Sequence, residues 1–431
     1  MTISRRDVLR GLAVVPAVGM ASSARARAQD SGEQVTLRVQ PQEDWFAEDA
    51  SPAAQTYRAA HERFIQENPN VTIEFEIIPP FERFRQYLIA DEAGNPPDIT
   101  FQGAANTFTL ASSGRMVPLN PFMEGHPYLN PQNLKSVVLD VETVDGQYYG
   151  IPTTTDVRLL YYRKDLFAQA GLDPNRPPAS REELLDYAQK LTKGEDQWGF
   201  GFIADNSLHA PHMWMCHTWA GGGELLAGDG KAIYDGPAGV AAAQLYQDLV
   251  NTLKVSPSQV ISTDYDGAVR ALVGGQYAMA LLGSWSWAEA LLGPLGEEKI
   301  GWTKVPVPAG GRDASFSGGW SWMISQKSQH QDVAWRYIEA INNEQVALTL
   351  GKTDISCWQS VLNHPEIQGT FVAEAGQYAA AASHGNPKVV TTQALFDGLR
   401  QAVQDITQGK AAPEEALRDA AAEYNSEYYE Q

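Results

Sequence analysis

Residues 71–101, VTIEFEIIPPFERFRQYLIADEAGNPPDITF, decide the fold class of this chain. Residues 71–78 alternate between apolar and polar side chains, which predicts a half-buried strand. Residues 81–93 have helical periodicity, the turn Gly94-Asn95-Pro96-Pro97 ends that helix, and residues 98–101 form a short strand candidate. A strand, a helix and a strand in this order predict a parallel βαβ unit.

The unit extends toward the N-terminus. Residues 34–39 alternate like a further strand, and residues 57–65 carry apolar side chains at helical spacing. The chain is therefore predicted to be an α/β protein with a parallel sheet. Ligands of such sheets bind beyond the carboxyl ends of the strands. This places the loop with Trp45 and the loop from Gln102 to Asn106 at one edge.

Later segments carry similar signals. Ser180 with Glu183 three residues later has the form of a capping box at a helix start. The other predicted elements are an extended segment at 150–155, strands at 159–162, 277–282 and after Gly318-Gly319, and helices at 164–170, 395–407 and 413–424.

The first thirty residues predict export. Arg5-Arg6 precede a modest apolar run from Gly11 to Met20, and small residues lead to Ala26-Arg27-Ala28. This order is that of a secretory signal, and the paired arginines resemble a twin-arginine signal. Because the run is about half of the roughly 20 residues that span a bilayer, we expect a cleaved signal at residues 1–28 and release into a bacterial periplasm.

Composition limits the kinds of partner. The 431 residues include 52 Asp and Glu against 32 Lys and Arg; residues 1–28 hold five Arg and one Asp, so their removal changes the net charge from −20 to −24. Such an acidic chain argues against nucleic acid and anionic membranes and is compatible with a neutral or cationic small molecule. A mature chain of this length predicts two domains.

The cysteine content leaves two alternatives open. The chain has two cysteines, Cys216 and Cys357. In an oxidising compartment they could form one disulfide, and the alternative is two separate buried thiols.

Several collinear segments resemble a known family. The most specific contains Gly150-Ile151-Pro152, then residues 160–167, LYYRKDLF, then Ala170-Gly171-Leu172. Residues 94–119, 275–285, 306–338 and 398–425 continue the match. Together they resemble the family 1 extracellular solute-binding proteins, the receptors of ABC importers that include maltose-binding and other oligosaccharide-binding proteins. Arg163 stands in place of the family's usual Asn.

The resemblance implies the two-lobed type II periplasmic binding protein fold with discontinuous lobes. The first lobe would comprise residues 29–151 and 309–352, and the second residues 152–308 and 353–431. Hinge closure over a ligand would produce the state that a membrane permease distinguishes. We therefore expect a monomer without cofactor or catalytic residues, which captures a sugar or sugar-like solute in an interlobe cleft and delivers it to an ABC permease.

Sugar sites need flat apolar faces and fixed polar groups for the hydroxyls. In the first lobe, Trp45 follows Glu43-Asp44 in the first strand-end loop, and we expect these three residues to line the site. The resemblance places ligand contacts at Gln102 and Asn106. Because Gln102 stands where maltose binders have an aromatic residue, this departure argues against maltose itself.

Two tryptophans alternate along one predicted strand, so only one can face the ligand. Trp320, beside Gly319 at a predicted glycine hinge, is the predicted ligand contact, and Trp322 is predicted to lie in the core.

In the second lobe, Trp285 matches a family position that stacks on sugar. Asp156 matches a carboxylate that accepts hydroxyl hydrogen bonds, although an ion pair with Arg158 is a competing interpretation. Phe396 matches an aromatic, ligand-stacking position of maltose-type members, and Trp358 is a further candidate.

Residues 209–217, HAPHMWMCH, offer four potential metal ligands. On a helix His209, His212 and Cys216 would share one face. Apolar neighbours and the resemblance favour His209, His212 and Trp214 as substrate contacts over a metal site.

Two alternatives stay open beside the binding protein. A periplasmic carbohydrate-active enzyme would use Glu43, Asp44 and Asp156 as acid and base. The sequence has no G-x-S-x-G, no H-E-x-x-H and no phosphate-binding glycine loop in its support. A binding protein for a cationic or metal ligand is the second alternative, supported by the acidic charge and the His/Cys cluster.

Overall fold

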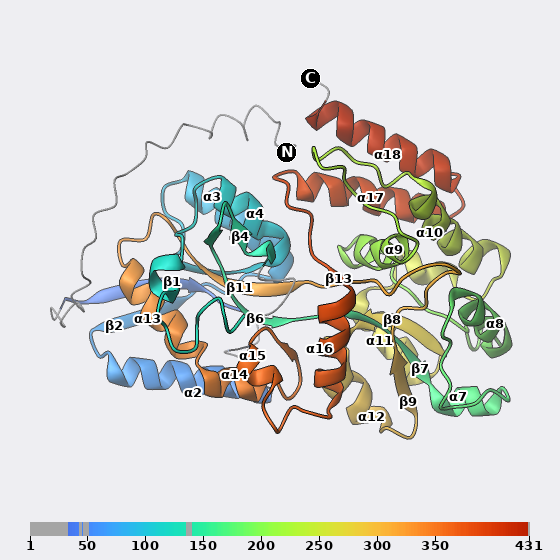
Figure 1. Ribbon diagram of the computed structural model, residues 1–431, viewed down its shortest axis with the longest axis horizontal. Coiled ribbons are helices and arrows are strands. Elements are labelled where there is room, and N and C mark those ends of the chain that lie inside the picture. The colour runs from blue at the N-terminus through green and yellow to red at the C-terminus, as the bar shows by residue number, and fades with distance from the viewer. Residues whose placement is uncertain (1–32, 43–44, 46–50, 135–139, 430–431) are drawn as a thin grey trace. The chain divides into compact units, whose positions relative to one another are not determined.

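The computed structural model describes residues 33–42, 45, 51–134 and 140–429 (Figure 1). The predicted signal and the carboxylates Glu43 and Asp44 lie outside these ranges. Contacts divide the chain into two compact units. Of the described residues, unit 1 comprises those up to 134, 140–153 and 320–350, and unit 2 comprises 154–319 and 351–429.

The units have the discontinuous order of the predicted lobes, with one clear difference. Residues 309–319 lie in unit 2, whereas the predicted first lobe includes them. The reason is a tertiary contact: strand β10 (Ser315–Phe316) pairs in parallel with β13 (Ser383–His384), which also belongs to unit 2.

Unit 1 is built on the predicted βαβαβ segment. Strand β1 (Val35–Gln40) pairs in parallel with β2 (Val71–Phe75) and with β3 (Ile99–Gly103). The later strand β11 (Gly319–Ile324) joins β3 antiparallel, so the sheet is mixed. Within unit 1 the strand order is thus β11-β3-β1-β2. Strand β6 (Ile151–Thr155) begins in unit 1, and its last two residues pair antiparallel with β12 (Ile355–Ser356) in unit 2.

Helix α2 of unit 1 begins at a residue that a local signal favours. The hydroxyl of Ser51 caps α2 (Pro52–Glu67) by accepting from the backbone of Ala54. Tyr87, Leu110, Met116 and Met323 form a buried cluster. The other elements of this unit are α3 (Pro80–Glu92), α4 (Ala104–Ser112), α5 (Asn120–Met123), β4 (Thr143–Val144), β5 (Gln147–Tyr148), α13 (Gln331–Ile341) and α14 (Glu344–Leu350).

Unit 2 has a three-stranded antiparallel sheet at its centre. Strand β7 (Arg158–Arg163) pairs with β8 (Met279–Gly283) on one side and with β9 (Ile300–Thr303) on the other. All six residues of β7 are buried, because both neighbouring strands and the covering helices exclude water from it.

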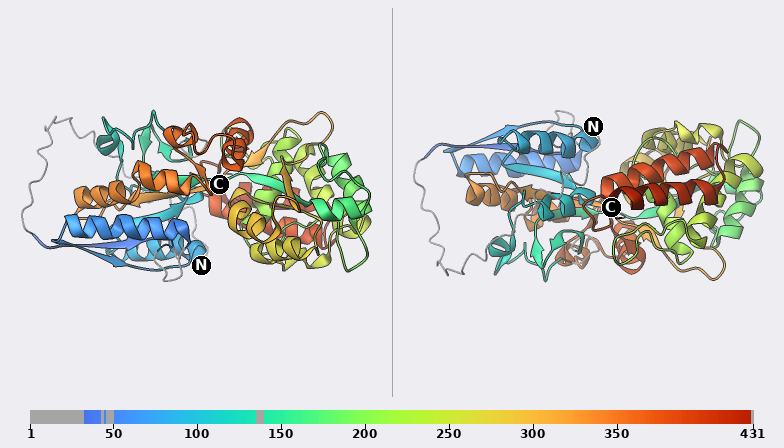
Figure 2. Two further views of the ribbon diagram at one scale, coloured as in Figure 1. Left: turned by 90° about the horizontal axis from the view of Figure 1, so that it is seen from below. Right: turned by 90° about the horizontal axis from the view of Figure 1, so that it is seen from above.

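Helices form most of the rest of unit 2. Helices α17 (Thr392–Thr407) and α18 (Pro413–Tyr428), red in the figures, run side by side in Figure 1 and in the right view of Figure 2. The other helical segments are α7 (Lys164–Gln169), α8 (Arg181–Leu191), α9 (His209–Ala220), α10 (Pro237–Gln247), η1 (Asp248–Thr252), η2 (Ser258–Ile261), α11 (Tyr265–Gly274), η3 (Ser284–Ser286), η4 (Trp287–Leu292), α12 (Gly293–Leu295), α15 (Gln359–Leu362) and α16 (Phe371–Ala382).

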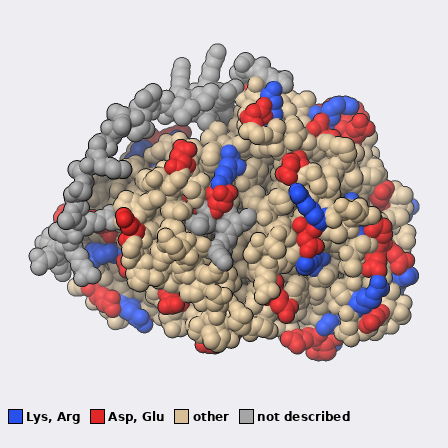
Figure 3. Space-filling view, viewed as in Figure 1, with Lys and Arg blue, Asp and Glu red and all other residues tan. Residues whose placement is uncertain are grey.

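The surface carries charges of both signs. On the face in Figure 3, acidic and basic side chains alternate over short distances. In the described part of the chain, no helix combines the length and the apolar character needed to cross a membrane.

Candidate functional site

The end of strand β8 presents Trp285, the predicted sugar-stacking residue. The indole folds back over the strand end, and a Cβ on Gly283 would lie 1.9 Å from the indole carbon Cζ3. Only glycine therefore permits this approach of ring and backbone. The indole is partly exposed and has the ring of Tyr265 stacked on it, with centroids 5.0 Å apart and planes 23° apart.

Arg158 joins the Trp285 ring to the rest of the cluster. Its guanidinium carbon lies 4.7 Å from the centroid of Trp285 and 4.9 Å from that of Phe316, which are distances of cation–π contacts. The same guanidinium forms an ion pair with Asp156, whose carboxylate is 18% exposed. The ion pair that competes with the ligand role of Asp156 is therefore present.

Asp156 is held by its surroundings in addition to Arg158. The backbone N–H of Gly318 donates to its Oδ1 at 3.1 Å, the atom that Arg158 also contacts. The hydroxyl of Ser317 donates to the backbone oxygen of Asp156 at 2.6 Å. The hydrogen bond from Gly318 and the contact with Arg158 thus meet at one carboxylate oxygen, and Oδ2 lies close to Gly318.

Helix α9 brings two predicted histidines to this cluster. The ring of His209 lies 4.7 Å from that of Tyr265 and 6.1 Å from that of Trp285. His212 stacks flat on Phe316 at 3.9 Å, and Phe396 meets it edge-on at 5.2 Å. Neither ring nitrogen of His212 has a hydrogen-bond partner among the described residues.

Both imidazoles are neutral at physiological pH. Burial, with a smaller contribution from the positive charge of Arg158, lowers the pKa of His209 to about 3. Burial likewise holds the pKa of His212 well below its usual range, again with Arg158 beside it. Among the described residues named in this cluster, Arg158 and Asp156 carry the formal charges, and these two charges cancel.

Three predicted contacts of unit 2 lie in its interior. Trp214 and Phe396 have no exposed surface, and Trp358 is 1% exposed. Trp214 packs edge-on against Tyr234. Of the three, Phe396 reaches the Trp285 cluster, through His212.

In unit 1, two predicted tryptophans meet at Phe101. Trp45 stacks on Tyr57 at 3.7 Å and lies 4.7 Å from Phe101. Trp320 stacks on Phe101 at 5.7 Å and is partly exposed, whereas Trp322 is fully buried, as the strand alternation predicts.

Gln102 belongs to a buried polar chain. It has no exposed surface, its Nε2 donates to Thr100 at 2.8 Å, and its Oε1 accepts from Asn106 at 3.3 Å. Gln102 therefore orients the partly exposed Asn106, and Asn106 is the member of the pair with access to solvent. The partly exposed Gly319 begins β11.

The described residues contain no group of three His, Cys, Asp or Glu side chains that could hold a metal ion. Cys216 contacts the backbone of His212 and of Phe316, and burial raises the pKa of its thiol to about 11. Cys216 and Cys357 are separate buried thiols, which answers the question that their number left open.

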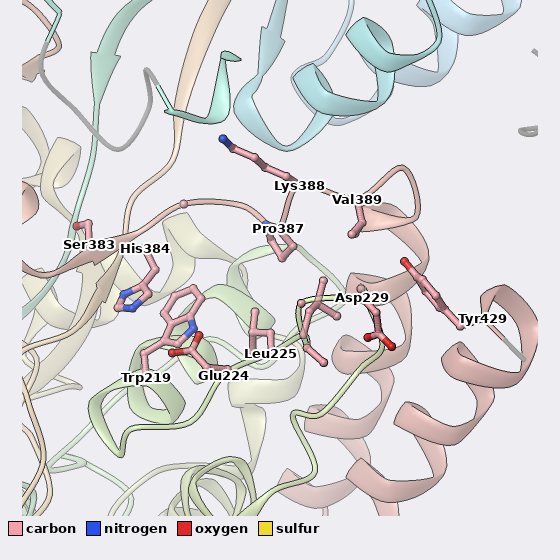
Figure 4. A pocket seen from close by; sticks show the side chains of 15 residues that line it. Trp219, Glu224, Leu225, Asp229, Ser383, His384, Pro387, Lys388, Val389 and Tyr429 are labelled. Carbon is pink, nitrogen blue, oxygen red and sulfur yellow. The ribbon is translucent and has the colours of Figure 1, made fainter. Parts of the chain in front are cut away.

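Two cavities lie in unit 2. One, of about 630 Å³, is lined by the segment after α9, by the segment after β13 and by Tyr429 (Figure 4). Trp219 and His384 stack at 4.5 Å in its wall. The other, of about 580 Å³, includes Trp287, Trp302 and Phe371. None of the predicted site residues lines either cavity.

Sequence reasoning missed three residues that organise the Trp285 cluster. Tyr265 begins α11, and Asp264 caps that helix by accepting from the backbone of Gly267. An Asp at an N-cap is a sequence signal from which the start of this helix could have been predicted. Phe316 and Ser286 carry no such signal, because their place depends on the tertiary packing of distant segments.

The two α/β units, with their discontinuous chain order, define the class of type II periplasmic binding proteins. An ABC transporter solute-binding protein of Thermotoga lettingae bound with α-D-tagatose has the same fold, with a TM-score of 0.81 at 24% identity over 91% of this chain and 99% of that one.

The sequence matches agree with this class. The bacterial extracellular solute-binding protein family matches residues 48–347, and the chain belongs to this family. A binding protein of Brucella abortus is 25% identical over 94% of this chain and 95% of its own length. The galactooligosaccharide-binding protein of Bacillus subtilis is 23% identical over 94% and 92%. The family consists of binding proteins rather than enzymes.

Proposed function

We propose that this protein binds a neutral sugar and delivers it to an ABC permease, with Trp285 as the principal stacking surface. The observation that carries the proposal is the pairing of a partly exposed indole at a strand end with an oriented carboxylate, Asp156, in one neutral cluster. An aromatic face binds the C–H surface of a sugar, and a fixed carboxylate accepts its hydroxyl hydrogens. The galactooligosaccharide-binding protein of Bacillus subtilis and the tagatose-bound protein of Thermotoga lettingae support the same class of ligand.

Trp45, Trp320 and Asn106 of unit 1 are proposed as further contacts. Trp45 and Trp320 both lie against Phe101. Trp320 belongs to β11, and Asn106 lies in the helix that follows β3, the strand that pairs with β11. His209 is proposed as a neutral hydrogen-bonding group beside Trp285.

The arrangement favours a neutral ligand over a cation. A cation at the histidines would meet the guanidinium of Arg158, whose charge also lowers the pKa of both imidazoles. Proton-transfer chemistry is not favoured either, because the carboxylate of Asp156 is ion-paired and the family members are binding proteins.

A thermal-shift experiment tests the proposal. The mature protein is heated with D-tagatose, maltotriose, galactobiose and divalent metals, and mass spectrometry monitors each sugar. A ligand present at about 100 times its Kd adds about 2.7 kcal/mol of stability. We expect a sugar to raise Tm in the presence of EDTA and to stay intact. A response to metal alone, or consumption of the sugar, contradicts the proposal.

Variants identify the stacking residue. Trp285→Ala is expected to weaken affinity for the stabilising sugar about tenfold, roughly 1.4 kcal/mol, because an aromatic contact is lost. Trp302→Ala is the matched control, since Trp302 is also a partly exposed tryptophan of unit 2 but lines a cavity that contains none of the proposed site residues. Equal losses in the two variants contradict the role of Trp285.

We also propose export by the twin-arginine route into the periplasm. The pair Arg5-Arg6 ahead of a short apolar run supports it. Replacing both residues by Lys is expected to leave the precursor in the cytoplasm, as cell fractionation and immunoblotting can measure. Unchanged export of that variant contradicts this route.

A further inference from the structure

The hydroxyl of Tyr265 contacts both ends of the turn that carries Trp285. The backbone N–H of Gly283 donates to the Tyr265 oxygen at 2.8 Å. The hydroxyl of Ser286, the residue directly after Trp285, shares a hydrogen bond of 2.6 Å with the same oxygen. Burial raises the pKa of this phenol above its usual range, so it keeps the proton with which it can donate.

The Tyr265 ring provides a second connection. It stacks on the indole of Trp285 at 5.0 Å, and it contacts the imidazole of His209 at 4.7 Å. Tyr265 is the first residue of α11, whose start is fixed by the cap from Asp264 to Gly267 at 2.7 Å. Tyr265 therefore connects the turn of residues 283–286 to helix α11.

We propose that Tyr265 is a positioning residue for the ligand site, because its hydroxyl holds the turn of residues 283–286 and thereby fixes the orientation of the Trp285 ring before ligand binds. A ring that is already oriented loses less conformational freedom on binding, which favours affinity. The consequence for binding rests on the proposed function, whereas the orientation of the ring does not.

A pair of Tyr→Phe variants separates the hydroxyl from the ring. Tyr265→Phe keeps the stacked ring and removes both hydrogen bonds, which leaves the N–H of Gly283 and the hydroxyl of Ser286 without this partner. Tyr246→Phe is the matched control, because the buried hydroxyl of Tyr246 has no partner among the described residues. Ser286→Ala removes one of the two bonds and serves if Tyr265→Phe fails to fold.

Fluorine NMR of protein labelled with 5-fluorotryptophan reads the orientation of Trp285 without ligand. Trp285→Phe assigns its resonance among those of the 11 tryptophans. We expect Tyr265→Phe, or Ser286→Ala in its place, to shift, broaden or split that resonance, and Tyr246→Phe to leave it unchanged. An unaltered Trp285 resonance in Tyr265→Phe, or in Ser286→Ala where it takes its place, overturns the proposal. A general loss of stability would not change this one signal selectively.

The same spectra with D-tagatose, maltotriose or galactobiose keep the two proposals distinguishable. If one of these sugars moves the Trp285 resonance of the wild type, we expect its affinity for Tyr265→Phe to be several-fold weaker than for Tyr246→Phe. Equal affinities overturn the binding consequence. If none of the three sugars moves the resonance, the proposed ligand site fails, and the ligand-free spectra still decide the role of Tyr265.

Discussion

Glu142 is a carboxyl group enclosed by hydroxyls. It has no exposed surface, and its two oxygens accept from Thr107 at 2.9 Å and from Ser321 at 2.7 Å. The backbone of Gly150 closes over it, since a Cβ there would lie 2.2 Å from Oε2. Burial raises the pKa of Glu142 to about 7, against the lowering effect of the two hydroxyls.

Glu142→Gln is expected to change how stability depends on pH. An unfolded chain ionises Glu near its usual pKa of 4.5, whereas the folded protein holds the proton up to about pH 7. The contribution of Glu142 to stability therefore falls as pH rises from 4.5 to 7, and at pH 8 this single contribution has decreased by roughly 3 kcal/mol. The Gln variant has no such loss, so its stability relative to wild type should be higher at pH 8 than at pH 5, as urea unfolding can measure.

Glu374→Gln is the control for this comparison, because Glu374 is exposed on α16. Its effect should be the same at both pH values. If Glu142→Gln also has the same effect at pH 5 and pH 8, the carboxyl does not retain its proton in the folded protein.

The sequence predicted the surroundings of some single residues and not of others. Trp285 stands at a strand end, two residues after Gly283, a pattern that a sequence can show, and it lies at a partly exposed position. Gln102 also follows a predicted strand, yet its side chain turns into a buried chain with Thr100. The direction of a side chain at a strand end depends on neighbouring strands, which local sequence does not specify.

The start of α8 illustrates how local chemistry determines an element. The Ser180 hydroxyl accepts from the N–H of Glu183 at 3.2 Å, as the capping box predicts. The carboxylate of Glu183 bonds the N–H of Ala179 at 2.9 Å, one residue before the expected one. Both groups nonetheless satisfy backbone donors at the helix start.

Ser180→Ala is expected to cost about 1 kcal/mol of unfolding free energy, because the N–H of Glu183 loses its acceptor. Ser426→Ala, at an exposed position of α18, is the matched control and should change stability by about 0.5 kcal/mol or less. Chemical denaturation measures both. Indistinguishable stabilities of the two variants would contradict the role of the cap.

Element boundaries depend partly on partners. The alternating residues 71–78 predict one strand, but β2 ends at Phe75, and the last pair of the ladder joins it to Val39. The next residue of β1, Gln40, is paired with Thr100 of β3, and Ile77 is 49% exposed. A strand continues only while a neighbour supplies hydrogen bonds, so the pattern alone overestimates its length.

At the scale of the whole molecule, distant segments are combined within each unit. Unit 1 takes β11 from the second half of the chain, and unit 2 takes the helices after residue 350. The Trp285 cluster likewise joins residues 156–158, 209–212, 265, 285 and 316, which lie far apart in sequence. The ring and cation–π contacts that hold this cluster together join residues that are far apart in the sequence.

The sequence by itself determined the α/β class, the order of most elements, the discontinuous organisation and the family, because periodicity, caps and motifs are local and survive as patterns. Only the tertiary structure decided that residues 309–319 belong to unit 2, that Cys216 and Cys357 are separate thiols, and that Tyr265 and Arg158 surround Trp285. These features depend on which surfaces meet when the chain packs, and burial then sets the charge states of His209 and Glu142.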